Sequence, residues 1–150
     1  SYMVLPFQLL EKYRSLYKDL IPYNNPKTLY TLHYFIKSGA YNRHINRMNK
    51  HYEKKRTLLI EHLEKKFKDA IVINDIPAGL HFTANFDTKR NYDEIEKRAD
   101  EYELELYSMR RFLLDQEPSL SQGIELLLGF ASIHEQTIEE AVERLYKIVM

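Results

Sequence analysis

Two adjacent arginines, Arg110 and Arg111, are the residues of this chain that are best suited to ligand binding. The planar guanidinium group donates two parallel hydrogen bonds to a carboxylate, which suits recognition of an amino acid. We expect Phe112, the next residue, to anchor the segment, and no acidic residue follows until Asp115. The alternative is that both arginines lie in a surface loop and bind no ligand.

Three histidines on one predicted helix invite a metal hypothesis. His44, His51 and His62 fall on the same face of that helix. A helix rises about 1.5 Å per residue, so neighbouring histidines stand roughly 10 Å or more apart. Two ligands on one helix need a spacing of four residues to share an ion. Solvated or hydrogen-bonded histidines are the favoured interpretation.

The same predicted helix is rich in lysine and arginine, which suggests nucleic-acid binding as an alternative. Its basic residues spread around several faces and are interleaved with Glu53, Glu61 and Glu64, as is typical of a solvated helix. Lys+Arg and Asp+Glu number 22 each, so the formal net charge is zero. No overall basic field therefore points to nucleic acid or to an anionic membrane.

Other catalytic motifs are not found in the sequence. The four glycines are scattered, so no glycine-rich phosphate loop is present. Cysteine is absent, which excludes disulfides, thiol nucleophiles and thiolate metal sites and fits a cytosolic protein. No apolar run is long enough for a membrane span. Glu103 and Glu105 are expected on one face of an exposed strand, where such pairs favour solubility over acid–base catalysis.

The N-terminal part of the sequence predicts one strand and two helices. The apolar residues 2–5 predict a buried strand, which Pro6 ends. A helix with apolar residues at helical spacing follows and extends to Pro22. A second helix begins at Pro26 and ends at Gly39. The first helix would leave apolar side chains exposed unless another segment covers them.

The remainder of the sequence predicts a mixed domain. A long helix with an apolar seam is predicted over residues 40–67. Later segments predict strands at 70–74, 80–86, 104–107 and 125–131 and helices at 91–102 and 137–149. Because helices and strands mix without strict βαβ repetition, the fold class is α+β. We place the domain boundary within residues 40–50.

Five motifs occur in order along almost the whole chain. They are Tyr2-Met3-Val4-Leu5-Pro6, the run from Ser38 to Met48 with Tyr41 and Arg43-His44, Ala78-Gly79-Leu80-His81, Tyr107 with Arg111-Phe112, and Leu127-Leu128-Gly129-Phe130-Ala131. Together they resemble the C-terminal part of the aminotransferase-like domain of MocR/GabR-type bacterial regulators in the GntR superfamily. Such regulators join an N-terminal winged-helix domain to a pyridoxal-phosphate (PLP)-dependent domain with the fold of type I aminotransferases.

This resemblance implies where the functional residues lie. The lysine that binds PLP would lie upstream of Ser1, so no lysine here takes that role and no PLP is expected on this chain. Members that sense GABA hold the effector's carboxylate with an arginine of the small domain, which corresponds to Arg111, with Arg110 as the fallback. Residues 1–39 would be a remnant of the large domain, and residues 40–150 the small C-terminal domain, an α+β piece of an α/β parent.

The resemblance also implies partners. The intact protein would be a cytoplasmic homodimer that binds PLP, an amino acid or amine effector, and DNA through a missing N-terminal domain, with no membrane. The start at Ser1 rather than methionine is interpreted as the mark of a fragment. One alternative is a fragment of a genuine PLP-dependent aminotransferase. Another is a helical interaction module built on residues 40–67, against which the alternating strands argue.

Overall fold

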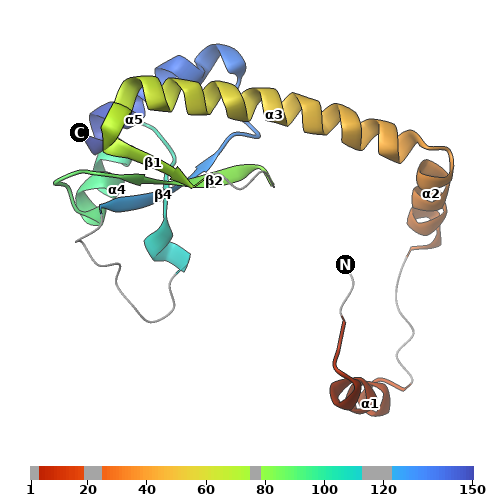
Figure 1. The fold of residues 1–150 in the computed structure, drawn as a ribbon. Helices are drawn as coiled ribbons and strands as arrows, with labels where there is room; N and C mark the ends of the chain where they lie inside the picture. Colours follow the sequence, from red (N-terminus) through yellow and green to blue (C-terminus); the bar gives the residue numbers. More distant parts are fainter. Residues whose placement is uncertain (1–3, 19–24, 75–78, 113–122) are drawn as a thin grey trace. The chain divides into compact units, whose positions relative to one another are not determined.

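A computed structural model describes residues 4–18, 25–74, 79–112 and 123–150 (Figure 1). The chain divides into an N-terminal unit, Ser1–His44, and a C-terminal unit, Ile45–Met150. Each unit is described by itself.

The N-terminal unit contains helices α1 (Phe7–Leu16) and α2 (Pro26–Lys37). The side chain of Asn25 caps α2 by accepting a hydrogen bond from the Lys27 backbone N–H at 3.0 Å. Gly39 follows α2 with a φ of +71°, the left-handed conformation that ends many helices. The predicted bounds of α2 are confirmed. Helix α1 ends at Leu16, and the predicted continuation to Pro22 lies outside the described residues from residue 19 onward.

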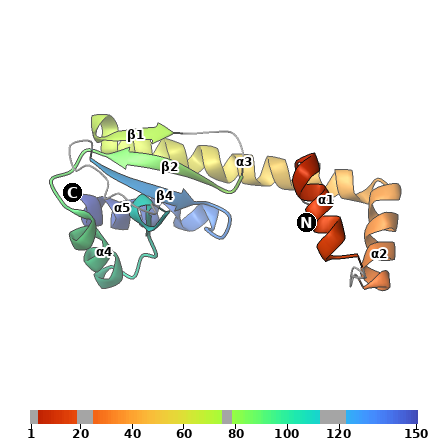
Figure 2. The same cartoon turned by 90° about the horizontal axis from the view of Figure 1, so that it is seen from below.

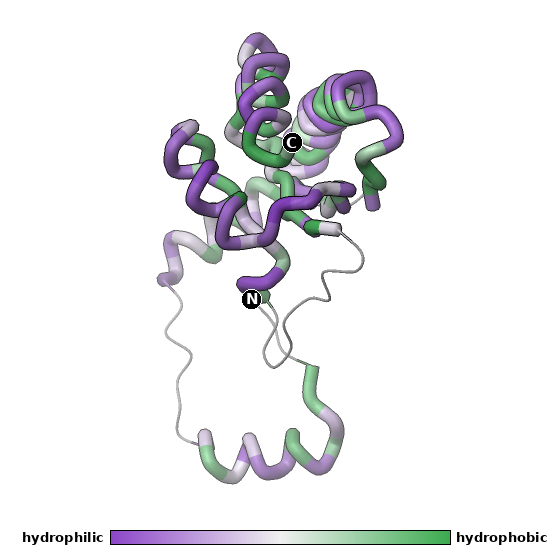
Figure 3. The backbone as a smooth tube through the Cα atoms, turned by 90° about the vertical axis from the view of Figure 1, so that its left-hand side faces the viewer, coloured by the Kyte–Doolittle hydropathy of each residue, from purple (hydrophilic) through white to green (hydrophobic). Residues whose placement is uncertain are grey.

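The predicted strand over residues 2–5 is wrong for Val4 and Leu5, while Tyr2 and Met3 lie outside the described residues. Val4 and Leu5 adopt irregular backbone, because no strand of the described residues pairs with them and an unpaired strand leaves its backbone groups unsatisfied. Neither α1 nor α2 has a buried residue, and Phe7 is 73% exposed. Figure 3 shows hydrophobic and hydrophilic residues alternating along α1, the helix that stands alone at the bottom of the view. The apolar side chains of α1 are uncovered, as predicted, and those of α2 are uncovered as well.

The C-terminal unit is built on one antiparallel sheet, which Figure 2 shows from below. Its strands are β1 (Ile71–Asn74), β2 (His81–Phe86), β3 (Tyr107–Ser108) and β4 (Ile124–Gly129), in the spatial order β1-β2-β4-β3. Phe86 pairs with both Ile71 and Ile124, which fixes the register across the three longer strands.

Three helices complete the unit: α3 (Ala40–Phe67), which belongs to this unit from Ile45 onward, α4 (Tyr92–Glu101) and α5 (Ile138–Val149). Short 3-10 turns η1 (Lys68–Ala70), η2 (Met109–Phe112) and η4 (Glu135–Thr137) link the elements. Helix α3 has the predicted bounds. Asn91 and Glu94 form a reciprocal capping box that fixes the start of α4.

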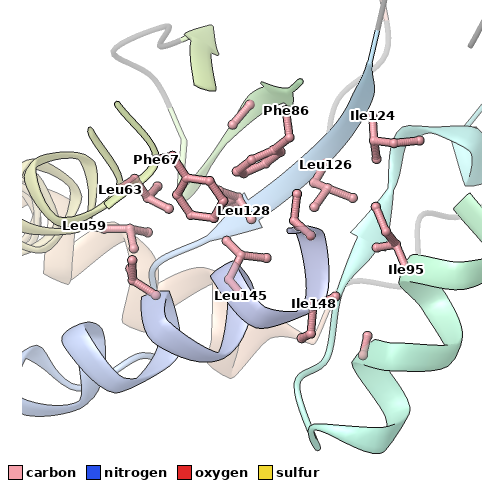
Figure 4. Close-up of a cluster of buried hydrophobic side chains, with 14 of the residues drawn as sticks. Leu59, Leu63, Phe67, Phe86, Ile95, Ile124, Leu126, Leu128, Leu145 and Ile148 are labelled. Carbon is pink, nitrogen blue, oxygen red and sulfur yellow. The ribbon is translucent and has the colours of Figure 1, made fainter. Parts of the chain in front are cut away.

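The core lies between one face of the sheet and the helices (Figure 4). Every second residue of β2 and of β4 is buried, which confirms the half-buried strand predicted from the alternation at residues 80–86. Leu63 of α3, Ile95 of α4 and Ile148 of α5 are fully buried against these strands. A helical layer on an antiparallel sheet is the α+β class that the sequence predicts.

The predicted strand over residues 104–107 is wrong except at its last residue. Helix α4 ends with the Leu104 N–H donating to the Ala99 carbonyl at 2.9 Å, and Glu103 adopts a φ of +51°. This helix C-terminal closure turns the chain, so that pairing with β4 begins only at Tyr107. Glu103 and Glu105 therefore do not share the face of a strand.

Replacing Glu103 with glycine is expected to raise the free energy of unfolding by about 0.5–1 kcal/mol, because a side chain in the left-handed conformation is strained and glycine is not. Urea denaturation followed by circular dichroism measures the effect. Lys97→Gly is the matched control, because Lys97 is an exposed residue inside α4 and glycine there should destabilise the helix by a similar amount. Equal losses of stability in the two variants would contradict this description of the helix end.

Candidate carboxylate-binding site

Arg110 is held in an ion-pair network that joins η2 to α4. Its Nη1 lies 2.7 Å from Asp93 Oδ1, and its Nη2 lies 3.1 Å from Glu96 Oε2. The other oxygen of Glu96 accepts a hydrogen bond at 2.6 Å from the hydroxyl of Ser108, which is buried. The guanidinium of Arg110 is thus engaged by carboxylates of the chain itself, which makes it the weaker candidate for a ligand carboxylate.

Arg111, the next residue, has a different environment. Its side chain is exposed, and its guanidinium carbon lies 5.4 Å from the centroid of the Tyr107 ring. In the described parts of the chain, no carboxylate forms an ion pair with Arg111. The expectation that Phe112 anchors the segment is wrong, because Phe112 is 57% exposed at the end of η2.

A cavity of about 340 Å³ brings Arg111 together with acidic residues. Glu96 and Asp100 of α4 line it, together with Glu105. Acidic side chains around one guanidinium favour a ligand with an ammonium group as well as a carboxylate and disfavour a second carboxylate. The sequence did not predict these acidic neighbours of Arg111, because folding, and not proximity along the chain, brings α4 to the cavity.

Tyr107 links Arg111 to Glu105. Its hydroxyl donates a hydrogen bond to Glu105, and this bond together with the negative charge of Glu105 raises the pKa of Tyr107 above its ordinary value. The positive charge of Arg111 acts in the opposite direction and lowers the pKa of Tyr107.

Glu105→Gln is expected to lower the pKa of Tyr107, because the substitution removes the acceptor and charge that favour the protonated phenol. Arg111→Ala is expected to raise the same pKa. The ring carbon that carries the hydroxyl, labelled with ¹³C, reports each titration by NMR, and Tyr107→Phe assigns the signal. Shifts of the same sign in the two variants would contradict the arrangement.

A second cavity joins two of the sequence motifs. It measures about 350 Å³. Gly79, Leu80 and Phe130 of the two motifs line it, together with residues of α3 that include Tyr52 and Arg56. Ala78, the first residue of its motif, lies outside the described residues. The contribution of α3 was missed from the sequence, because a basic residue on a long helix has no local mark that sets it apart from a solvated one.

Lys55 of α3 is the only buried lysine among the described residues, with 8% of its surface exposed. Its Nζ donates to the Ala131 carbonyl at 2.9 Å. The ammonium group of Lys55 is therefore already engaged by a backbone carbonyl. The described ranges also provide no glycine-rich loop that could bind a phosphate. The residues of this part of the chain do not fit the lysine and phosphate sites that PLP requires, so no chemistry through that cofactor is assigned to them.

Lys55→Met is expected to lower the free energy of unfolding by about 1–3 kcal/mol, because it leaves the Ala131 carbonyl without its donor. Lys54→Met is the matched control. Lys54 pairs with Glu135 at 2.6 Å, but its side chain is 69% exposed, so its loss should cost at most about 1 kcal/mol. Chemical denaturation of both variants measures the difference, and equal costs would refute a structural role for Lys55.

Two histidines of the long helix lie beside aromatic rings. The His44 ring lies 6.3 Å from the Phe35 ring, and the His51 ring lies 5.3 Å from the Tyr52 ring. Throughout the described residues, no group of three histidine, cysteine or acidic side chains is placed to hold a metal ion. The same residues include no helix that is long and apolar enough to cross a membrane.

No model of a known protein family matches the chain. The chain is similar in sequence to two uncharacterized HTH-type transcriptional regulators of Bacillus subtilis (strain 168). It is 30% identical to YdeL over 148 residues and 24% identical to YhdI over 145 residues. Each comparison covers 97% of this chain and 30% of the relative, so the chain spans about three tenths of the length of these regulators.

Solved structures of aminotransferases share the fold. The kynurenine aminotransferase of Pyrococcus horikoshii superimposes with a TM-score of 0.67 at 17% identity, over 77% of this chain and 28% of the enzyme. The α-aminoadipate aminotransferase LysN of Thermus thermophilus superimposes with a TM-score of 0.66 at 17% identity, over 79% of this chain and 29% of the enzyme. The chain is thus related in sequence to HTH-type transcriptional regulators and carries an aminotransferase-like fold, which confirms the resemblance to MocR/GabR-type regulators.

Proposed function

We propose that the chain is the C-terminal piece of the effector-sensing domain of a MocR/GabR-type regulator. The observation that carries this proposal is one combination: the sequence relatives are HTH-type regulators, whereas the fold is that of aminotransferases. A sensing domain derived from an aminotransferase accounts for both. A genuine aminotransferase accounts for the fold but not for the sequence relatives.

In this proposal residues 1–39 belong to the large domain and residues 40–150 form the small domain. The absence of buried residues in α1 and α2 supports this division, because helices of a large domain need that domain to cover their apolar side chains. The buried core of β2, β4 and α5 supports a small domain that has its own hydrophobic interior.

The intact protein would be a cytoplasmic homodimer that binds PLP and DNA through segments upstream of Ser1. The effector would be an amino acid, with its carboxylate on Arg111, or an amine. Closure of the small domain around the ligand would then change the affinity of the dimer for DNA. This mechanism requires the ligand to bind the closed state more tightly than the open state, because only differential affinity shifts a conformational equilibrium.

The test uses the full-length protein loaded with PLP and the DNA upstream of its own gene. A panel of α- and ω-amino acids is expected to contain at least one that changes the affinity for this DNA in an electrophoretic shift assay without net transamination. The 150-residue chain is the control and should not bind the DNA, because its net charge is zero. Turnover of an amino acid with a 2-oxo acid by a full-length protein that does not bind DNA would establish the aminotransferase instead.

A further inference from the structure

The C-terminal unit contains an apolar cavity of about 290 Å³ at the β3 edge of the sheet. Its location follows from the short pairing of β3. Tyr107 pairs with Leu127, but the preceding residues diverge from β4, and the space between them opens toward α5. Leu104 and Leu106 line one side of this space.

Buried aliphatic side chains form the inner wall of the cavity. They come from three elements: Leu59 of α3, Leu128 of β4, and Val142 and Leu145 of α5. Each of these side chains is less than 9% exposed, so the wall is part of the hydrophobic core. An apolar cavity of this kind is poorly suited to ordered water, because it offers water few hydrogen-bond partners.

The mouth of the cavity is polar and carries one sign of charge. Glu105, Tyr107 and Ser132 are its polar lining residues. Glu105 is the only charged residue among the described residues that line it, and its carboxylate accepts a hydrogen bond from the Tyr107 hydroxyl. A ligand that complements this cavity has an apolar body and a cationic head.

We propose that this cavity binds a small alkylammonium compound, with the hydrocarbon chain against the leucines and the ammonium at Glu105. Apolar cavities of about 150 Å³ accommodate benzene, so one of about 290 Å³ suits a chain of roughly six to eight carbons. The cavity adjoins the one beside Arg111 and shares Leu104, Glu105 and Leu106 with it, but Arg111 does not line it, and the proposed binding requires neither PLP nor DNA. It adds to the proposed function a second ligand, which would act on α5 and the 104–107 segment.

The proposal can be tested on the 150-residue chain by methyl NMR with n-hexylammonium chloride as the probe. Saturable shifts are expected for the methyl groups of Leu59, Leu104 and Leu145. Along the series from ethylammonium to hexylammonium, each added methylene should tighten binding by about three- to fourfold. Hexanoate has a similar tail and the opposite charge, and it should bind about two- to fivefold more weakly.

Three variants separate the contributions of charge and volume. Glu105→Gln should abolish the preference for hexylammonium over hexanoate, whereas Glu103→Gln should preserve it, because Glu103 does not line the cavity. Ala141→Phe places a ring in the cavity and should remove binding. If that variant does not fold, Leu106→Phe provides the same block from the opposite wall.

Three results would overturn the proposal. The first is the absence of saturable shifts at any probe concentration that leaves the chain folded. The second is equal binding of hexanoate and hexylammonium. The third is shifts confined to the exposed leucines of α1 and α2, such as Leu9 and Leu29, which would indicate nonspecific adsorption on apolar surface.

Discussion

Replacing Gly123 with alanine is expected to destabilise the C-terminal unit by about 2–5 kcal/mol. Gly123 has a φ of +83°, a conformation that strains any residue with a side chain. A Cβ atom at this position would lie 2.4 Å from the Phe86 carbonyl oxygen and 2.7 Å from Asn85 Oδ1. The Phe86 oxygen belongs to the backbone of β2 and cannot rotate away, so relief of the clash requires movement of the strand itself.

The size of this effect follows from where Gly123 lies. It precedes Ile124, whose pairing with Phe86 begins the β2–β4 ladder at the centre of the sheet. Displacement of β4 at this point would disturb Phe86, which is fully buried and whose ring centroid lies 4.9 Å from that of Phe67 on α3. Both the sheet and its contact with the long helix are therefore affected.

Urea denaturation followed by circular dichroism measures the loss, and Gly129→Ala is the matched control. Gly129 ends the same strand, but an added Cβ there would meet no atom within 4 Å. Its substitution should change the free energy of unfolding by less than about 1 kcal/mol. A Gly123→Ala protein with the same denaturation midpoint as the unsubstituted chain would show that β2 and β4 do not approach each other as described.

The elements that the sequence predicted well are those with a strong local pattern. Helix α3 has an apolar seam over its whole length and begins directly after Gly39, so both its type and its bounds were readable. Strands β2 and β4 alternate or concentrate apolar residues, because one face is buried against helices. These signals depend only on residues that are near one another in the chain.

The errors arose where structure depends on distant residues or on an unusual backbone. The turn that follows α4 was mistaken for the start of a strand, because Glu103 adopts a conformation that glycine usually marks in a sequence. The partners of Arg110 were missed because Asp93 and Glu96 lie 17 and 14 residues before it in the chain. The burial of Lys55 against Ala131 joins residues 76 positions apart and has no local signature.

The candidate site also combines residues that the local sequence identified with partners that are distant in the chain. The sequence identified the pair Arg110 and Arg111 but could not rank them from charge alone. The structure distinguishes them, because the carboxylates of Asp93 and Glu96 engage Arg110, and Arg111 lies exposed over Tyr107. The choice of Arg111 now rests on its surroundings as well as on the family motif.

In the full-length protein, Arg111→Ala is expected to weaken binding of an amino acid effector by about 30-fold or more. This factor corresponds to about 2–5 kcal/mol for the loss of a bidentate ion pair that the proposed closure of the small domain would partly bury. The melting temperature should change little, because no carboxylate among the described residues depends on Arg111. Isothermal titration calorimetry measures the affinity, and differential scanning calorimetry measures the stability.

Arg110→Ala is the internal control, and the two variants should show opposite profiles. Loss of Arg110 breaks its pairs with Asp93 and Glu96, which are partly exposed, so it should lower stability by about 1 kcal/mol and affect ligand affinity less. Arg111→Lys adds a further distinction: it keeps the charge but not the planar fork, so it should restore only part of the affinity. Equal effects of Arg110→Ala and Arg111→Ala on ligand affinity, or unfolding of the domain by Arg111→Ala, would exclude Arg111 as the residue that holds the effector's carboxylate.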